Sequence, residues 1–161
     1  MKLSITRRFE FAAAHRLQNH GGRCRFLHGH TYVLEVTLEA IQPEGGGGMI
    51  LDFADLKVGV RAELANFDHV TLLETGDPLI EAIQGASGDL GGSTIIGVTD
   101  KPPTVEYLVE RLTERLIRRF EPVPVRVARV RLYETPNCWA DCVREGLVEH
   151  CGLSRPGEVE R

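Results

Sequence analysis

The sequence predicts a single α+β domain in which an antiparallel sheet carries two helices on one face. Apolar and polar residues alternate in stretches near both ends of the chain, which is the two-residue period of a strand. Two segments between them repeat apolar residues every three or four positions, as helices do. The resulting order, ββααββ, is typical of the α+β class. A length of 161 residues suits one domain.

The first two strands are expected at residues 2–13 and 28–41. In the first, the apolar residues share one face, and His15 continues their parity. In the second, an apolar face alternates with a polar one over most of its length. The apolar residues are Phe9, Phe11 and Ala13 in the first strand and Tyr32, Leu34, Val36 and Leu38 in the second; the polar face of the second is Glu35, Thr37 and Glu39.

Two helices and two further strands follow. Asp52 is expected to cap the first helix, and Thr104, which follows two prolines, is expected to cap the second. The apolar stripes are Phe53, Leu56, Val60 and Leu64 in the first helix, and Val105, Leu108, Val109, Leu112, Leu116, Ile117 and Phe120 in the second. The last strands are predicted at Val125–Glu134, which is rich in β-branched residues, and at Trp139–Arg144.

The segment 74–100 interrupts this pattern. It is rich in Gly, Asp, Ser and Thr, and it is predicted to be a long loop with a short helix at Pro78–Ile83. A loop of this length in a compact domain is usually functional or disordered. The domain is expected to span residues 1–153, and the polar segment 154–161 to form a loose tail.

Composition excludes several classes of protein. The formal net charge is −4, so no overall basic field favours nucleic acid. No apolar run approaches the roughly 18 residues of a membrane span, and the N-terminus lacks the apolar core of a secretory signal. The four cysteines do not have the spacing of a secreted disulfide scaffold. We therefore expect a cytoplasmic protein with reduced thiols and with neither a nucleic-acid nor a membrane partner.

Three histidines form a candidate metal site. His28 and His30 are two residues apart at the start of a predicted strand, so both side chains point to one face. His15 reaches the same face if the first two strands pair. Three neutral imidazoles leave a metal its full charge and an open fourth position, which is the pattern of catalytic zinc. The His-x-His motif is short, so three unrelated histidines remain the alternative on this pattern alone.

Cys24 lies four residues before His28, and three interpretations of it are open. It can be a fourth, structural zinc ligand or a small buried hydrophobic residue. It can also be a thiolate that acts as base or nucleophile, because Arg23, Arg25 and a nearby metal would lower the pKa of its thiol. The distinction depends on geometry, since a ligating thiolate would close the metal site.

Several polar residues have both a functional and a structural interpretation. Asp68 and His69 match an acid–base pair, although a surface pair is the more common explanation. Glu134 continues an apolar strand face, where a carboxylate needs a partner such as the two N–H donors of an aminopyrimidine, unless it turns into solvent. Thr104 and Glu106 also fit a helix cap and a first-turn acid. We interpret the other cysteines, Cys138, Cys142 and Cys151, as packing residues.

Taken in order, these segments resemble the 6-pyruvoyl-tetrahydropterin synthase and 6-carboxy-tetrahydropterin synthase family. Each block is weak alone, but together they span most of the chain and are specific. The blocks are Phe11-Ala12-Ala13-Ala14-His15-Arg16-Leu17, Cys24-x-x-x-His28-Gly29-His30, Met49-Ile50-Leu51-Asp52-Phe53, Asp68-His69, Pro103-Thr104-Val105-Glu106 and Glu134-Thr135.

The resemblance implies a tunnelling fold, or T-fold, with a four-stranded antiparallel sheet and two helices on one face. It implies a homohexamer, a dimer of trimers, with active sites between subunits. In matching positions, His15, His28 and His30 would bind Zn²⁺, and Cys24, Asp68 and His69 would be catalytic. Glu134, Thr104 and Glu106 would bind the pterin.

The implied reaction is the zinc-dependent conversion of 7,8-dihydroneopterin triphosphate to 6-carboxy-tetrahydropterin, acetaldehyde and triphosphate, in the synthesis of 7-deazapurines such as queuosine. The alternative within the family is 6-pyruvoyl-tetrahydropterin synthase, which eliminates triphosphate for the tetrahydrobiopterin pathway. A non-catalytic zinc module with Cys24 as fourth ligand and a metal-free pterin aldolase-like enzyme are alternatives of other classes. Candidates for binding the triphosphate are Arg7, Arg8, Arg16, Arg23 and Arg25.

The chain departs from the family pattern in two places. Leu73 stands where the family often has an asparagine after the Asp-His pair, and segment 74–100 is longer than in compact members. Both departures lie close in sequence to the predicted acid–base pair. They therefore affect the expected substrate range more than the expected metal site.

Overall fold

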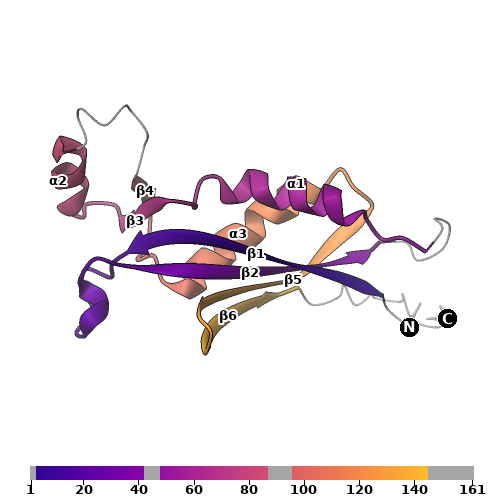
Figure 1. Cartoon of the computed structure of the whole chain (residues 1–161), viewed down its shortest axis with the longest axis horizontal. Coiled ribbons are helices and arrows are strands. Elements are labelled where there is room, and N and C mark those ends of the chain that lie inside the picture. The colour runs from indigo at the N-terminus through magenta and orange to yellow at the C-terminus, as the bar shows by residue number, and fades with distance from the viewer. Residues whose placement is uncertain (1–2, 42–47, 87–95, 145–161) are drawn as a thin grey trace, which may run out of the picture.

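The computed structural model describes residues 3–41, 48–86 and 96–144. Within these residues, a six-stranded sheet is accompanied by three α-helices and one 3₁₀ turn (Figure 1). The strands are β1 (Ser4–His15), β2 (His28–Ala40), β3 (Val70–Glu74), β4 (Ile96–Thr99), β5 (Val125–Thr135) and β6 (Cys138–Val143). The helices are α1 (Phe53–Leu64), α2 (Leu79–Ala86) and α3 (Val105–Phe120), and the 3₁₀ turn is η1 (Arg23–Arg25). No helix in the described part of the chain is long and apolar enough to cross a membrane.

The α+β class is confirmed, but the prediction of four antiparallel strands and two helices is wrong in number. The sheet order is β4-β3-β1-β2-β5-β6, and β3 pairs in parallel with both β1 and β4. The segment predicted as a loop, 74–100, holds β4 and α2, so the short helix expected at Pro78–Ile83 is present but shifted. Residues 87–95 of that segment and the predicted tail at 154–161 lie outside the described residues.

Helices α1 and α3 cover one face of the long strands, and β3, β4 and α2 extend one end of the molecule (Figure 1). From Tyr32 to Leu38, the face of β2 toward the helices is apolar and fully buried, as its alternation predicts. Gly59 lets α1 approach α3, because a Cβ atom there would lie 2.7 Å from Cζ of Phe120. The central buried residues are Tyr32, Leu34, Val36, Leu38, Leu56, Val60, Leu108, Leu112, Leu116, Val130 and Leu132.

Both predicted helix caps are confirmed. The Asp52 carboxylate accepts a hydrogen bond from the backbone N–H of Ala54 at 2.6 Å, and α1 begins at the next residue after the cap. The Thr104 hydroxyl accepts one from the backbone N–H of Tyr107 at 3.3 Å, which begins α3. These side chains satisfy donors that the first turn of a helix leaves unpaired. The cap at Thr104 fixes where α3 starts relative to the sheet.

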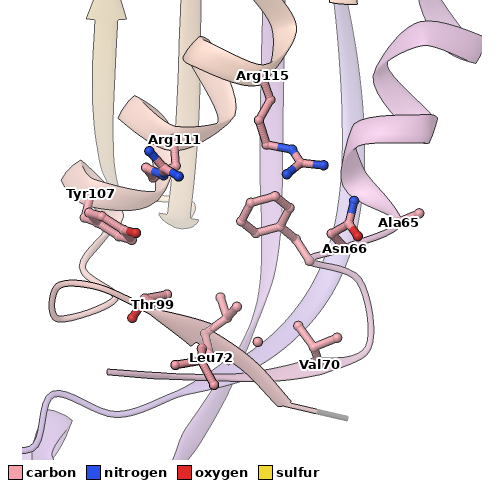
Figure 2. A pocket seen from close by; sticks show the side chains of 11 residues that line it. Ala65, Asn66, Val70, Leu72, Thr99, Tyr107, Arg111 and Arg115 are labelled. Atoms are coloured by element: carbon pink, nitrogen blue, oxygen red, sulfur yellow. The ribbon is translucent and has the colours of Figure 1, made fainter. Parts of the chain in front are cut away.

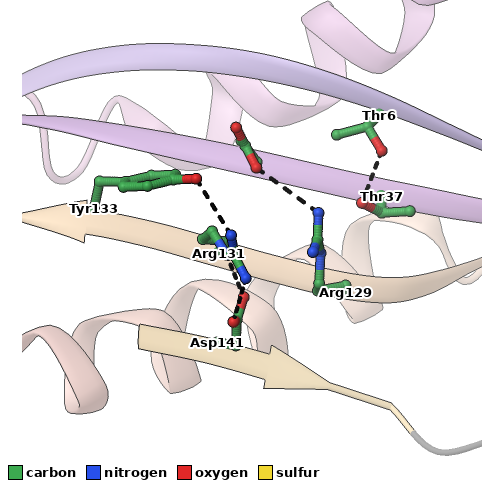
Figure 3. Close-up of polar contacts among 7 residues, drawn as sticks. Thr6, Thr37, Arg129, Arg131, Tyr133 and Asp141 are labelled. Carbon is green, nitrogen blue, oxygen red and sulfur yellow. Dashed lines mark hydrogen bonds and ion pairs between the residues drawn. The ribbon is translucent and has the colours of Figure 1, made fainter. Parts of the chain in front are cut away.

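The sheet face away from the helices is polar. Arg131 donates two hydrogen bonds of 2.7 Å to the Asp141 carboxylate and lies beside Tyr133, while Arg129 pairs with Glu35 at 3.8 Å (Figure 3). The helices lie behind the strands in this view. This face therefore forms a solvated surface of charge pairs, as the odd-numbered positions of β2 predict.

A buried ion pair joins the end of β1 to the segment before α2. The Arg16 guanidinium donates to both carboxylate oxygens of Asp77, with a distance of 2.7 Å from Nε to Oδ2. Asp77 also accepts from the backbone N–H of Leu79 at 2.8 Å. The Asp77 side chain is 1% exposed. Arg16 directly follows His15, so this pair fixes the strand end that carries a candidate metal ligand.

Replacing Asp77 with asparagine is expected to lower the free energy of unfolding by about 3 kcal/mol, because it leaves the Arg16 charge largely buried and unpaired. Asp141→Asn is the matched control, since Asp141 also pairs with an arginine through both oxygens but on the exposed sheet face. Its expected cost is at most about 1 kcal/mol. Urea unfolding of the metal-free proteins measures both values. Equal losses would contradict a special role for the buried pair.

Acid should erase the difference between wild type and Asp77→Asn. Hydrogen bonds from Arg16 hold the pKa of Asp77 below its ordinary 3.8, against the opposing effect of burial. A carboxylate with a lowered folded-state pKa stabilises the protein above its unfolded pKa and loses that contribution as pH falls through the folded value. We therefore expect the two unfolding free energies to converge below pH 3.8. A difference that stays constant through the acid range would contradict this expectation.

Candidate metal centre

Three histidine side chains meet at one end of the sheet. In the antiparallel pairing of β1 with β2, His15 lies opposite His28, and Ala13 lies opposite His30. Because strand residues two apart share a face, this register brings all three imidazoles together on the helix side of the sheet. One ring nitrogen from each lies within 4.8 Å of the others. The predicted grouping of the three histidines is confirmed, and it suits a divalent metal.

Hydrogen bonds define which nitrogen of two rings is free. Nδ1 of His15 lies 2.8 Å from the carbonyl oxygen of Pro103, and Nδ1 of His28 lies 2.8 Å from that of Phe26. A carbonyl only accepts, so each ring donates from Nδ1 and its neutral form keeps a lone pair on Nε2. Nε2 of His15 and Nε2 of His30 are buried without hydrogen-bond partners among the described residues. Backbone carbonyls orient metal-binding histidines in this way in many proteins.

The surroundings favour neutral imidazoles. Burial lowers the pKa of both His15 and His30, and this effect outweighs the opposing influence of the Glu134 carboxylate. Neutral imidazole is the form that binds a metal. Three neutral nitrogen ligands with an open fourth position suit zinc better than calcium or magnesium, which prefer oxygen ligands.

Glu134 lies beside two of the three histidines. Its Oε1 atom is 3.3 Å from Nε2 of His15 and 3.8 Å from Nε2 of His30. It sits near the end of β5, on the same strand face as the buried Val130 and Leu132. The alternative that this carboxylate turns into solvent is therefore wrong. A carboxylate facing two lone pairs at these distances requires a proton or a metal between them.

Tyr32 also borders the site, although the sequence indicated only that it belongs to the core. Its ring centroid is 5.6 Å from that of His30 and 6.1 Å from that of His15. Burial first, and then the Glu134 carboxylate, raise the pKa of its hydroxyl. The spacing His28-x-His30-x-Tyr32 could have placed it, because the three residues share one face of β2.

Asp68 and His69 form a real pair. Oδ1 of Asp68 lies 2.8 Å from Nδ1 of His69 and accepts from the backbone N–H of Ala12 at 2.9 Å. His69 has a positive φ of 60°, which the hydrogen bond from its N–H to the Ala12 carbonyl at 2.6 Å helps to hold. The His69 side chain is 82% exposed. His30 and His69 both line a shallow depression of about 440 Å³, so this pair and the metal group lie at the same end of β1.

Cys24 lies in the turn η1, close in sequence to the histidines but outside the group of possible metal ligands found among the described residues. Its backbone carbonyl accepts from the N–H of Leu17 at 2.8 Å, which holds the turn against the end of β1. The thiol is free and half-buried. This geometry does not favour Cys24 as a fourth ligand of the same ion.

Comparison with known proteins identifies the family. A family model described as 6-pyruvoyl tetrahydropterin synthase matches residues 4–145. The chain belongs to this family. It is 35% identical over 144 residues to 6-carboxy-5,6,7,8-tetrahydropterin synthase from Rickettsia bellii, covering 86% of this chain and 99% of the relative. It is 27% identical over 164 residues to the protein of the same name from Aquifex aeolicus, covering 90% and 100%.

Solved structures show the family fold. An uncharacterized protein from Wolinella succinogenes aligns with a TM-score of 0.74 at 25% identity, covering 90% of this chain and 99% of that one. The 6-pyruvoyl tetrahydropterin synthase of Caenorhabditis elegans aligns with a TM-score of 0.62 at 24% identity, covering 90% and 97%. The T-fold prediction is thus confirmed for the single chain, with β3 and β4 added to the expected four strands.

The remaining predicted residues have mixed outcomes. Thr104 caps α3, and Glu106 is exposed in the first turn of that helix. Among the described residues, neither side chain has a recorded contact with the three histidines. Arg16 is committed to Asp77, which leaves four of the five arginines as candidates for a phosphate chain. Leu73, the departure from the family pattern, is fully buried in β3 and serves the core.

The prediction that the other cysteines are packing residues is confirmed only in part. Cys142 packs against the core, whereas Cys138 is exposed at the start of β6, so the prediction is wrong there. Cys138 begins β6, which is the edge strand of the sheet among the described residues. Cys151 lies outside the described residues.

A separate cavity of about 490 Å³ lies between α3, the end of α1 and the strands β3 and β4 (Figure 2). Arg111 and Arg115 border it, but each is already paired, with Glu114 and Glu63 respectively, at 2.9 Å. None of the three histidines lines it. Glu63 also pairs with Arg119 at 2.9 Å, so one carboxylate serves two arginines beside this cavity.

Proposed function

We propose that the chain is a zinc-dependent 6-carboxy-5,6,7,8-tetrahydropterin synthase. It would convert 7,8-dihydroneopterin triphosphate and one water to 6-carboxy-tetrahydropterin, acetaldehyde and triphosphate, as a lyase in the synthesis of 7-deazapurines such as queuosine. The observation that carries this proposal is the group of three imidazoles beside a carboxylate, two of them with buried Nε2 atoms that lack a hydrogen-bond partner among the described residues. The names of the curated relatives support the carboxy branch over the pyruvoyl branch.

His15, His28 and His30 would hold the zinc through Nε2, and the carbonyls of Pro103 and Phe26 would orient two of the rings. Bound zinc supplies Lewis acidity, which polarises the hydroxyl groups of the pterin side chain and acidifies the adjacent C–H bond. Glu134 would accept hydrogen bonds from the aminopyrimidine edge, since its two oxygens match two parallel N–H donors. The short distances from Oε1 to the nitrogens of His15 and His30 support this role, since the anchor would lie beside a bound metal.

Cys24 would move the proton at the activated carbon. Asp68 and His69, in contact at 2.8 Å, would complete the relay. His69 is largely exposed in the single chain, which suits a residue that completes the active site of a neighbouring subunit. We therefore propose the family's homohexamer, a dimer of trimers, with sites between subunits. In that assembly, Thr104 and Glu106 would border the pterin pocket. The charge of the triphosphate would be offset by arginines, with Arg7, Arg8, Arg23 and Arg25 as candidates. We propose that the enzyme acts in the cytoplasm.

Incubation of the purified zinc protein with 7,8-dihydroneopterin triphosphate should release acetaldehyde and triphosphate in equal amounts. A chelator should abolish both products, and added zinc should restore them. Mass spectrometry of the pterin product and an enzymatic assay for acetaldehyde make the measurement. Triphosphate release without acetaldehyde would point to the 6-pyruvoyl branch instead. Turnover that persists after complete removal of metal would favour the metal-free aldolase-like class.

A further inference from the structure

The hydroxyl of Tyr32 lies near the three histidines but has no role in holding the metal or moving the proton. The side chain is completely buried, and its hydroxyl has no hydrogen-bond partner among the described residues. The ring stacks on Phe11, with centroids 5.1 Å apart and planes inclined by 12°. The ring also lies edge-on to the rings of His15 and His30. The hydroxyl therefore lies within the core, beside the metal group.

A buried hydroxyl without a partner costs free energy that phenylalanine would avoid. Packing alone does not require it, because Phe11, the cross-strand neighbour, fills the same layer with a plain ring. The described residues contain three such unpartnered buried atoms: Nε2 of His15, Nε2 of His30 and the Tyr32 hydroxyl. A bound metal would be the missing partner of the two nitrogens. The hydroxyl is left as a donor that needs an acceptor at the metal centre.

Glu134 is the acceptor that most needs such a donor. Its Oε1 atom lies 3.3 Å and 3.8 Å from two of the nitrogens that would bind zinc. Zinc bound at its usual distance of about 2.0–2.1 Å from each nitrogen would lie within reach of this carboxylate. Glu134 would then become a fourth ligand and would close the position that the substrate needs. A carboxylate that anchors the pterin must be held away from the metal.

We propose that Tyr32 is a positioning residue whose hydroxyl donates a hydrogen bond to the Glu134 carboxylate when metal and pterin occupy the site. This bond keeps Glu134 off the metal and directed at the aminopyrimidine edge. The inference rests on the proposed function, because it assumes a pterin as the bound molecule. Tyr32 would thus decide whether the Glu134 carboxylate acts as a metal ligand or as the substrate anchor.

The variant Tyr32→Phe tests the proposal with a binding probe that cannot turn over. The probe is 7,8-dihydroneopterin, which lacks the triphosphate leaving group, titrated into the zinc-loaded protein and followed by calorimetry. We expect Tyr32→Phe to weaken probe binding roughly 10- to 100-fold, the range for a lost hydrogen bond to a charged group. Zinc content should stay at the wild-type level. The metal-free variant should melt at the same temperature as wild type or higher, since an unpaired buried hydroxyl is removed.

Tyr133→Phe is the matched control, because it deletes a tyrosine hydroxyl next in sequence to Glu134 but on the opposite, polar face of the sheet. It should leave probe binding unchanged. In a background of Glu134→Gln, which itself weakens binding, Tyr32→Phe should cost less than about 3-fold further, because the two residues act through one contact.

Three results would overturn the inference while leaving the proposed function in place. These are wild-type probe affinity in Tyr32→Phe, loss of zinc from that variant, and effects of Tyr32→Phe and Glu134→Gln that simply multiply. Failure of the zinc-loaded wild type to bind the probe would overturn the proposed function, and this inference with it.

Discussion

Replacing His30 with alanine is expected to abolish metal binding and turnover. His30 supplies one of three nitrogen atoms that lie within 4.8 Å of one another. Without it a bound zinc would keep two imidazoles, and Glu134 could replace the lost ligand only by giving up its role as pterin anchor. Loss of an outer partner of a zinc ligand typically costs 10- to 100-fold in metal affinity, so loss of the ligand itself should cost at least about 100-fold. Metal analysis after dialysis, together with the product assay, measures both effects.

His20→Ala is the matched control for this prediction. His20 is an exposed histidine that accepts a hydrogen bond from the Gly22 backbone at 2.9 Å and stands outside the metal group. The control should retain one zinc per chain and full turnover. We expect His30→Ala to fold, because the His30 side chain is only partly buried, and thermal unfolding of the metal-free proteins checks this. Wild-type metal content in a folded His30→Ala protein would refute the three-histidine site.

Replacing Cys24 with alanine should leave zinc in place and remove turnover. Cys24 lies outside the group of possible ligands, but its turn is hydrogen-bonded to the end of β1 that carries His15. A positioned acid or base typically contributes 10²- to 10⁴-fold to a rate, so we expect a loss of about that size. Substrate affinity should change little, because the thiol acts on the reacting carbon rather than on the pterin ring.

Cys142→Ala provides the comparison for Cys24→Ala, since both side chains are half-buried free thiols and Cys142 lies in β6. It should keep both zinc and turnover. If Cys24→Ala instead lost its zinc in proportion to its activity, Cys24 would be the fourth ligand. The chain would then be a closed structural zinc module, and the chelated protein should unfold.

Much of the fold follows from local pattern. The alternation in β1 and β2, the stripe in α3 and the caps at Asp52 and Thr104 all come from neighbouring residues, and all were predicted. The strands β3 and β4 were not. They are five and four residues long, too short to show a period, and they form because each finds a parallel partner far away in sequence. Pairing of this kind is not visible in composition, which predicted a loop over 74–100, where β4 lies, and no element at β3.

The site divides in the same way. Strand parity grouped His15, His28 and His30 and gave Glu134 an inward direction, because a two-residue period fixes the face of every side chain. Parity gives no distances, so it could not distinguish a Glu134 in solvent from one that is 3.3 Å from a histidine nitrogen. It also treated Tyr32 as one more core residue.

The sequence by itself determined the α+β class, the helix starts, the family resemblance and the three histidines, since each depends on residue type and local spacing. Only the tertiary structure decided the six-stranded sheet, the commitment of Arg16 to Asp77, and the carbonyls that orient His15 and His28. It also decided which buried polar atoms lack partners. The physical reason is that hydrogen-bond satisfaction depends on which distant segments come together, and backbone carbonyls such as that of Pro103 are present at every position of the sequence.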